Sequence, residues 1–284
     1  MLASLLALSS AGLYGAADFL GGLAARRAST VAVVAVSQCS GLVVLALMLP
    51  LLPDAAPAMR DLTWGAVAGI AVGVGLALLY RALAVGRMAV VAPTTAVCAV
   101  LIPVVVAVGL GERPGPRTLG GIALAIVSIV LVSRQRTSAS QAHPAAPGPS
   151  AGLGLALLAG VAIGVFFLSL ARTAPTAGLW PVLAARVVSV GLFGVVAISG
   201  GHSLRMTRPV AAIVIAGGVL DMLANALYLV ATRHGPLSLV VTLSSLYPAS
   251  TVVLALAVLG ERLSALQGAG IACALAAVLL IVGG

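Results

Sequence analysis

Two stretches of sequence decide the fold: LGERPGPRTLGGIA at residues 110–123 and LGERLSALQGAGIA at residues 259–272. Each contains Leu-Gly-Glu-Arg followed by Gly-Ile-Ala at the same spacing, and the offset between them is 149 residues. The same offset aligns further glycines without a gap: Gly15 with Gly164, Gly69 with Gly218, and Gly86 with Gly235. The chain therefore contains two similar halves.

The composition places these halves in a membrane. Of the 284 residues, 62% are hydrophobic and 7% are charged, against roughly 45–50% and 25% in soluble domains. A soluble enzyme, a secreted disulfide scaffold and a disordered regulator are excluded. All 15 basic residues are Arg, scattered between apolar runs without a basic face, so no nucleic-acid partner is expected. The lipid bilayer is the expected surrounding.

Apolar runs separated by Pro, Gly and Arg predict ten transmembrane helices, each near the roughly 20 residues that a bilayer requires. They fall near residues 2–23, 30–52, 62–80, 88–109, 117–133, 152–171, 179–199, 209–230, 238–258 and 264–282. Five spans per half is an odd number, so the second half crosses the membrane in the opposite direction. The expected fold is an all-α integral membrane protein of two five-helix inverted repeats, a plan typical of secondary transporters.

A polar segment rich in Pro and Ala, QRTSASQAHPAAPGPS at residues 135–150, predicts a flexible linker between the halves. The expected domains are residues 1–134 and 151–284, each packing its own helices. Within the third span, Gly65, Gly69 and Gly73 recur at a spacing of four. This spacing predicts a face on which two helix backbones approach closely.

The repeat ends resemble those of EamA-type carriers of the drug/metabolite transporter superfamily. The resemblance is carried by residues 80–133 and 243–284, where a Tyr precedes the Gly-Glu-Arg turn and a Gly-rich helix follows it. It implies a central cavity lined by the first four helices of each half, with the fifth and tenth helices outside. The family often has an Arg in the second helix of a repeat. Arg186 fits that place in the second half, but Ser37 and Gln38 stand there in the first, so the substrate does not carry over.

Three ionisable residues lie clearly inside predicted spans: Asp18, Arg186 and Asp221. A charge at this depth costs about 3 kcal/mol on insertion scales, so it usually faces a cavity or a partner. At about 1.5 Å per residue, Arg186 and Asp221 lie within about 3 Å of the same depth, and Asn225 shares a helix face with Asp221. Two interpretations stay open. The pair is a neutralising ion pair, or Arg186 holds an anionic group while Asp221 binds a cationic group or the coupling proton.

Asp18 and Gln38 are expected nearer the opposite membrane face. Asp18 is either a solvated or Arg26-paired carboxylate, or it contacts a cation at the cavity mouth together with Tyr14, one turn earlier. Tyr80, near a span end, is expected to anchor the helix at the membrane interface.

Two further groups of residues have candidate roles at helix ends. Pro103 and Pro248 lie deep enough in their spans to break a helix and take part in gating. The repeat-end turns consist of Gly111, Glu112, Arg113, Gly260, Glu261 and Arg262. In each turn the Glu is expected to cap the following helix and to pair with the adjacent Arg. No Walker A, GxSxG, HExxH or Cys/His metal spacing is present, so no cofactor, metal site or enzymatic activity is expected.

These features predict a secondary transporter that exports small organic metabolites or drugs across the bacterial inner membrane by alternating access. Export rests on the resemblance alone. One alternative is a divalent-cation carrier of the same superfamily, which two acids opposed by an Arg disfavour; another is a non-transporting receptor or scaffold. Protons as the coupling ion and a homodimer are left open. Nine Arg in loops after odd-numbered spans, against five in the other loops, predict that the termini lie outside.

Overall fold

The computed structural model describes residues 1–51, 55–109, 115–133, 149–235, 240, 243–244, 246–261 and 263–282. Within these residues the chain forms ten α-helices and two short 3-10 helices. The first half contains α1 (Leu2–Ala25), α2 (Thr30–Met48), η1 (Leu49–Leu51), α3 (Met59–Val85), α4 (Met88–Gly109) and α5 (Pro116–Ser133). The second half contains α6 (Pro149–Leu170), η2 (Pro175–Ala177), α7 (Trp180–Ser199), α8 (Arg208–His234), α10 (Tyr247–Leu259) and α11 (Ala265–Val282). The α-helices follow the ten predicted spans in order.

Seven of the described helices are long and apolar enough to cross a bilayer: α1, α2, α3, α6, α7, α8 and α11. The other three carry shorter apolar segments, which are Met88–Pro103, Pro116–Ser128 and Tyr247–Leu259. The ninth span is predicted from residue 238, whereas α10 begins at Tyr247 with Pro248 in its first turn. Proline is well suited to this place because its missing N–H would have no partner there.

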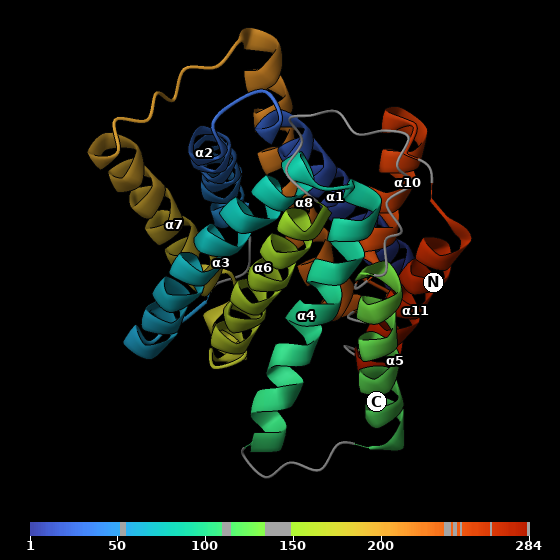
Figure 1. The fold of residues 1–284 in the computed structure, drawn as a ribbon. Helices are drawn as coiled ribbons and strands as arrows, with labels where there is room; N and C mark the ends of the chain where they lie inside the picture. Colours follow the sequence, from blue (N-terminus) through green and yellow to red (C-terminus); the bar gives the residue numbers. More distant parts are fainter. Residues whose placement is uncertain are drawn as a thin grey trace.

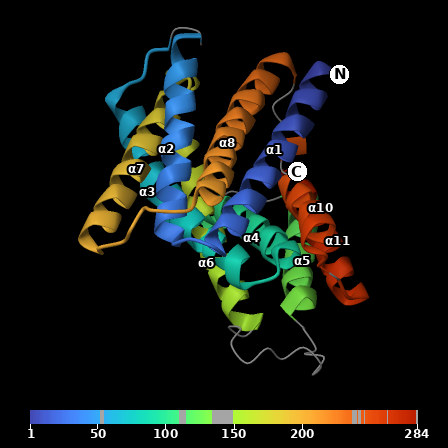
Figure 2. The same ribbon diagram turned by 90° about the horizontal axis from the view of Figure 1, so that it is seen from above.

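The helices of the two halves interlock instead of forming two separate bundles (Figure 1). Helix α1 packs along α8 and α10, and its counterpart α6 packs along α3 and α4. Helix α2 contacts α7 and α8, and α5 pairs with α11. In both views α2 and α7 lie at one side of the molecule and α5 and α11 at the other (Figures 1 and 2). The expectation that each half packs its own helices is therefore wrong, because the main helix pairs join the halves.

The contacts between the halves recur at the repeat offset. The Thr95 hydroxyl of α4 donates to the Ala156 carbonyl of α6 at 3.2 Å. The residue 149 positions later, Ser244, donates to the Ala7 carbonyl of α1 at 3.4 Å, and Ala7 is the counterpart of Ala156. The repeat in the sequence is thus also a repeat in the packing.

Glycines set the distance between α3 and α7. A methyl group at Gly65 would lie 2.5 Å from the Pro181 carbonyl oxygen, and one at Gly73 would lie 2.8 Å from the Ser189 hydroxyl. At Gly69, between them, the methyl group would lie 2.8 Å from the Ala185 Cα. The predicted close-packing face is confirmed, and it brings the Ser189 face of α7 against α3.

Candidate functional site

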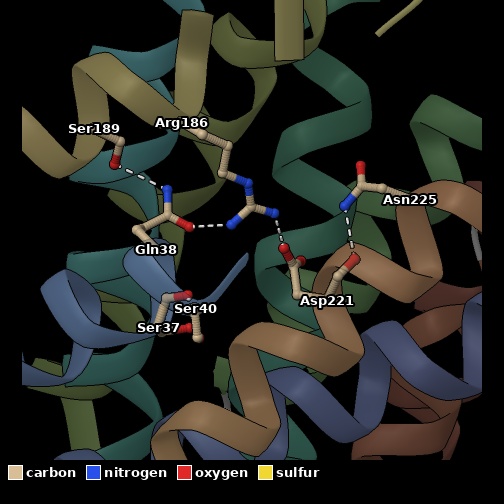
Figure 3. A network of polar contacts seen from close by, with 7 residues as sticks. All are labelled: Ser37, Gln38, Ser40, Arg186, Ser189, Asp221 and Asn225. Carbon is tan, nitrogen blue, oxygen red and sulfur yellow. Dashed lines mark hydrogen bonds and ion pairs between the residues drawn. The ribbon is translucent and has the colours of Figure 1, made fainter. Parts of the chain in front are cut away.

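A buried polar network joins α2, α7 and α8 (Figure 3). The Arg186 side chain is 8% exposed, and its Nη2 forms a salt bridge with Asp221 Oδ2. Its Nη1 donates to Gln38 Oε1, and Gln38 Nε2 donates to the Ser189 hydroxyl at 2.9 Å. One acid and one amide therefore hold the guanidinium, from two different helices.

Small residues leave room for this guanidinium beside α2. A methyl group at Gly41 would lie 2.7 Å from Arg186 Nη1, and one at Gly218 of α8 would overlap the Ser37 carbonyl. The Ser40 hydroxyl is already bonded to that Ser37 carbonyl at 2.8 Å, within its own helix. The backbones of α2 and α8 therefore approach closely, and Arg186 reaches the gap from α7.

The sequence places Gln38 with Asp18 near the opposite membrane face, but the structure places it against Arg186. The reason is the geometry of the repeat. Ser37 is the counterpart of Arg186 at the offset of 149, and α2 contacts α7. Two symmetry-related helices that cross meet at equivalent positions, so the residue after Ser37 falls beside Arg186.

Arg186 and Asp221 are in contact, as their equal depth allows. Asp221 is the more accessible partner, since 23% of its side chain is exposed. Asn225, one turn further along α8, donates its amide to the Asp221 backbone carbonyl at 2.8 Å and not to the carboxylate. The Asp221 carboxylate therefore remains open on one side.

Asp18 lies close to this network. It interacts electrostatically with Asp221 and also with Tyr80 and Tyr247. Tyr14, one turn before Asp18, packs edge-on against Tyr247 with ring centroids 6.3 Å apart and an interplanar angle of 64°. The predicted partners Asp18 and Tyr14 thus lie near a second aromatic ring, supplied by α10.

Arg26, the alternative partner predicted for Asp18, is bound elsewhere. Its Nη2 lies 3.8 Å from Glu261 Oε1 and donates to the Leu83 carbonyl at 3.3 Å. Within the described ranges, neither a hydrogen bond nor a salt bridge reaches the Asp18 carboxylate.

Glu261 caps a helix, but not the helix predicted from the sequence. Its carboxylate accepts the N–H groups of Met88 at 3.0 Å and Ala89 at 3.1 Å, at the start of α4 in the other half. A negative charge there offsets the positive end of the helix dipole. The following helix, α11, is capped instead by Ser264 and Gln267, which exchange backbone and side-chain hydrogen bonds. The turn therefore connects the halves, with Arg26 as its ionic partner.

The remaining residues of the two turns are placed only in part. Gly260 ends α10 with a φ of +63°, a left-handed conformation that favours glycine. Arg262 and residues 111–113 (Gly111, Glu112 and Arg113) lie outside the described residues, as does most of the predicted linker. Helix α4 continues through Pro103 without a break, whereas Pro248 is buried in the first turn of α10.

Two polar residues have places that the sequence reasoning missed. Tyr80 is expected at the membrane interface, yet it is 2% exposed, and its ring lies against Gly21 of α1. The adjacent glycines at 21 and 22 are the signal that could have indicated this contact. Asp61 accepts N–H groups from Ala58 at 2.9 Å and from Ala174 at 2.8 Å, tying the start of α3 to the turn after α6.

The site offers charged and amide groups, with no cluster suited to a metal ion. In the part of the chain that the structure describes, no group of three or more His, Cys, Asp or Glu side chains could hold one. Two interlocked five-helix halves with charged residues buried where they meet define a class of protein, the membrane transporters built on an internal repeat.

The chain belongs to the EamA-like transporter family, whose model matches residues 1–134 and again residues 150–283. It is therefore a multi-pass membrane protein of a transporter family and not an enzyme. A solved structure described as "Crystal structure of protein" is similar with a TM-score of 0.57 at 16% sequence identity, over 98% of this chain and 95% of that one. At this identity the likeness shows the fold alone. No curated protein matches the chain in sequence.

Proposed function

We propose that the protein carries small organic solutes across the bacterial inner membrane by alternating access, as an exporter. The network of Arg186, Asp221 and Gln38 carries this proposal, because it lies where α2 of the first half meets α7 and α8 of the second. The fold does not require these charges, since the counterparts of Arg186 and Asp221 are Ser37 and Val72. The direction of transport rests on the resemblance to the superfamily's carriers.

The network has one link within the second half, which is the salt bridge, and two links between the halves, both made by Gln38. Arg186 and Asp221 come from neighbouring helices of the second half, whereas Gln38 comes from the first. A movement of one half against the other would break the hydrogen bonds of Gln38 with Arg186 and Ser189 and leave the salt bridge in place. Asp221, with its partly exposed carboxylate, is the residue that we assign to the coupling proton or to a cationic group of the solute.

Two alternative functions make different predictions. A divalent-cation carrier needs a shell of six or more oxygen ligands, which Asp18 and Asp221 with Arg186 beside them do not provide. A receptor or scaffold would produce no solute flux in any membrane.

The test begins with an export and resistance screen of cells that express the chain. The flux of each solute that the screen identifies is then measured into liposomes that contain the purified protein. Asp221→Asn keeps the shape of the side chain but removes its titration. We expect it to abolish flux driven by a pH gradient and to spare solute exchange. Arg186→Gln is expected to lower transport, with the exposed Arg172→Gln as the matched control.

A purely structural pair would behave differently from a working one. The double variant would then restore transport together with folded protein, whereas a working pair would leave the double variant folded but without flux driven by a pH gradient. Full transport by the double variant would contradict the roles proposed for Arg186 and Asp221.

A further inference from the structure

Asp18 is a charged residue inside the bundle for which the described residues supply no partner. It is only partly exposed on α1, and two arginines that could have paired with it are engaged elsewhere, Arg26 with Glu261 and Arg186 with Asp221. Its counterpart in the second half is Phe167. The fold therefore does not need an acid at this place, and a membrane protein rarely keeps an unneeded one.

The geometry of α1 turns Asp18 inward. The Ser10 hydroxyl is bonded to the α8 backbone at 2.8 Å, and the Gly15 carbonyl accepts a hydrogen bond from α10 at 3.0 Å. At about 100° of rotation per residue, Tyr14 and Asp18 fall between these two contact positions. Their side chains therefore start from the face of α1 that lies between α8 and α10.

Three tyrosines lie near this face. Tyr14 and Tyr247 meet edge-on, and the buried Tyr80 comes from α3. All three phenols interact electrostatically with Asp18. A carboxylate among aromatic rings is an arrangement that recognises organic cations, because the ring faces and the acid both attract positive charge.

We infer that the transported solute is an organic cation with one positive charge, such as an amine or a quaternary ammonium group on an apolar body, and that Asp18 is its counter-ion. This inference rests on the proposed function. Arg186 and Asp221 are paired with each other, so Asp18 is the acid among the three groups that has no cationic partner in the described part of the chain. A cation neutralises it, whereas an anionic solute would have to displace Asp221 from Arg186.

The test uses probes of similar size and opposite charge. Benzyltrimethylammonium keeps its positive charge at every pH. The second probe, 3-phenylpropanoate, also carries one phenyl ring but is an anion. Binding to the purified full-length protein is measured by calorimetry, separately from flux into liposomes. We expect the cation to bind at least about tenfold more tightly than the anion, which corresponds to one well-placed charged contact.

Variants connect the binding to Asp18. Asp18→Asn is expected to weaken binding of the cation about tenfold or more, while Asp18→Glu retains most of it. Tyr14→Leu should weaken binding and Tyr14→Phe should not, since the aromatic face is the part that a cation uses. A thermal unfolding curve accompanies each variant. Because Asp18 has no partner to lose, Asp18→Asn should melt no lower than the unchanged protein.

The outcomes separate this inference from the proposed function. Preference for 3-phenylpropanoate, or equal cation binding by Asp18→Asn, would overturn the assignment of Asp18 even if solutes are transported. A fall in melting temperature of Asp18→Asn with unchanged cation affinity would also overturn it, in favour of a structural role. Cation binding that depends on Asp18, without flux of any solute, would support Asp18 as a cation-binding residue and contradict the proposed transport function.

Discussion

Arg186 contacts partners on two helices, and because its side chain is buried, the loss of either partner should lower the stability of the protein. Removing one member of a buried ion pair typically costs about 3–5 kcal/mol, because the other charge is left alone, whereas removing both is often neutral. Asp221 keeps 23% of its side chain exposed, so loss of Arg186 leaves Asp221 partly hydrated. Loss of Asp221 instead leaves a guanidinium that is 8% exposed. Removing Asp221 and removing Arg186 therefore leave charges that differ in burial, so the two losses should differ in cost.

This inequality predicts an order of stabilities. We expect Asp221→Asn to lower the melting temperature of the detergent-solubilised protein more than Arg186→Gln does, since it strands the more deeply buried charge. The double variant should melt above both single variants. A double variant that melts below either single one would mean that the two residues act independently.

Individual residues also show where sequence reasoning stops. Counting residues along a helix gives depth in the membrane, and this correctly allowed Arg186 to meet Asp221. It does not give the neighbour at that depth, so the contact of Gln38 with Arg186 was not predicted, and Tyr80 was assigned to the membrane interface. The helix crossing that brings Gln38 to Arg186 depends on the two-fold relation between α2 and α7. That relation follows from the repeat only when the packing is known.

At the scale of helices, glycines decide which pairs can form. Gly69 of α3 faces the Ala185 backbone at a distance that excludes a methyl group, whereas Gly191 on α7 has no atom within 4 Å of such a group. The two positions make a matched pair, because both are glycines inside transmembrane helices.

We expect Gly69→Ala to lower the melting temperature, since the backbone of α7 cannot move away without disturbing Ser189 and its network. Gly191→Ala should be neutral or stabilising by up to about 1 kcal/mol, the difference in helix propensity between the residues. Both are measured by thermal unfolding of the purified protein. Equal effects of the two variants would show that the α3–α7 contact tolerates a wider separation.

Glu261 is the second element-scale feature, since it caps a helix that lies far away in the sequence. Glu261→Gln should destabilise the protein by about 0.5–2 kcal/mol, the usual range for a lost helix cap. Arg26→Gln should have a smaller effect, because an ion pair with a partly exposed partner is worth about 1 kcal/mol or less. Chemical denaturation can rank the two variants. The reverse order would show that the ion pair, and not the cap, holds this turn.

Helix positions were predictable because runs of apolar residues are long and their ends are marked by Pro, Gly and Arg. The cap was not. The Glu of the turn stands just before α11, so local reasoning assigns it there, but Ser264 and Gln267 already satisfy that helix. Only the packing of α4 against α10 and α11 reveals the open N–H groups of Met88 and Ala89.

At the scale of the whole molecule, an odd number of spans per half fixes the relation between the ends of the two halves. Reporter fusions after residue 140 and after residue 284 should therefore report opposite compartments, with residue 140 in the cytoplasm if the distribution of Arg between loops sets the orientation. Identical reports from both fusions would rule out five spans in the second half.

The Glu261 cluster, formed by Arg26, Arg87, Glu261 and Gln267, ties the halves together at one membrane face. Arg87 supplies its other inter-half link, donating to Gln267 at 2.8 Å. The counterparts of the two arginines are Pro175 and Pro236, and that of Gln267 is Thr118, so the opposite face cannot form the same set of bonds. The opposite face is joined instead by the hydrogen bond from the Ala174 N–H to Asp61, so the two faces are held by different bonds. On the alternating-access mechanism proposed above, we expect the two faces to differ in how readily they open. Because apparent affinity falls with the fraction of molecules competent to bind, the same solute should saturate the carrier at different concentrations from the two sides of the membrane.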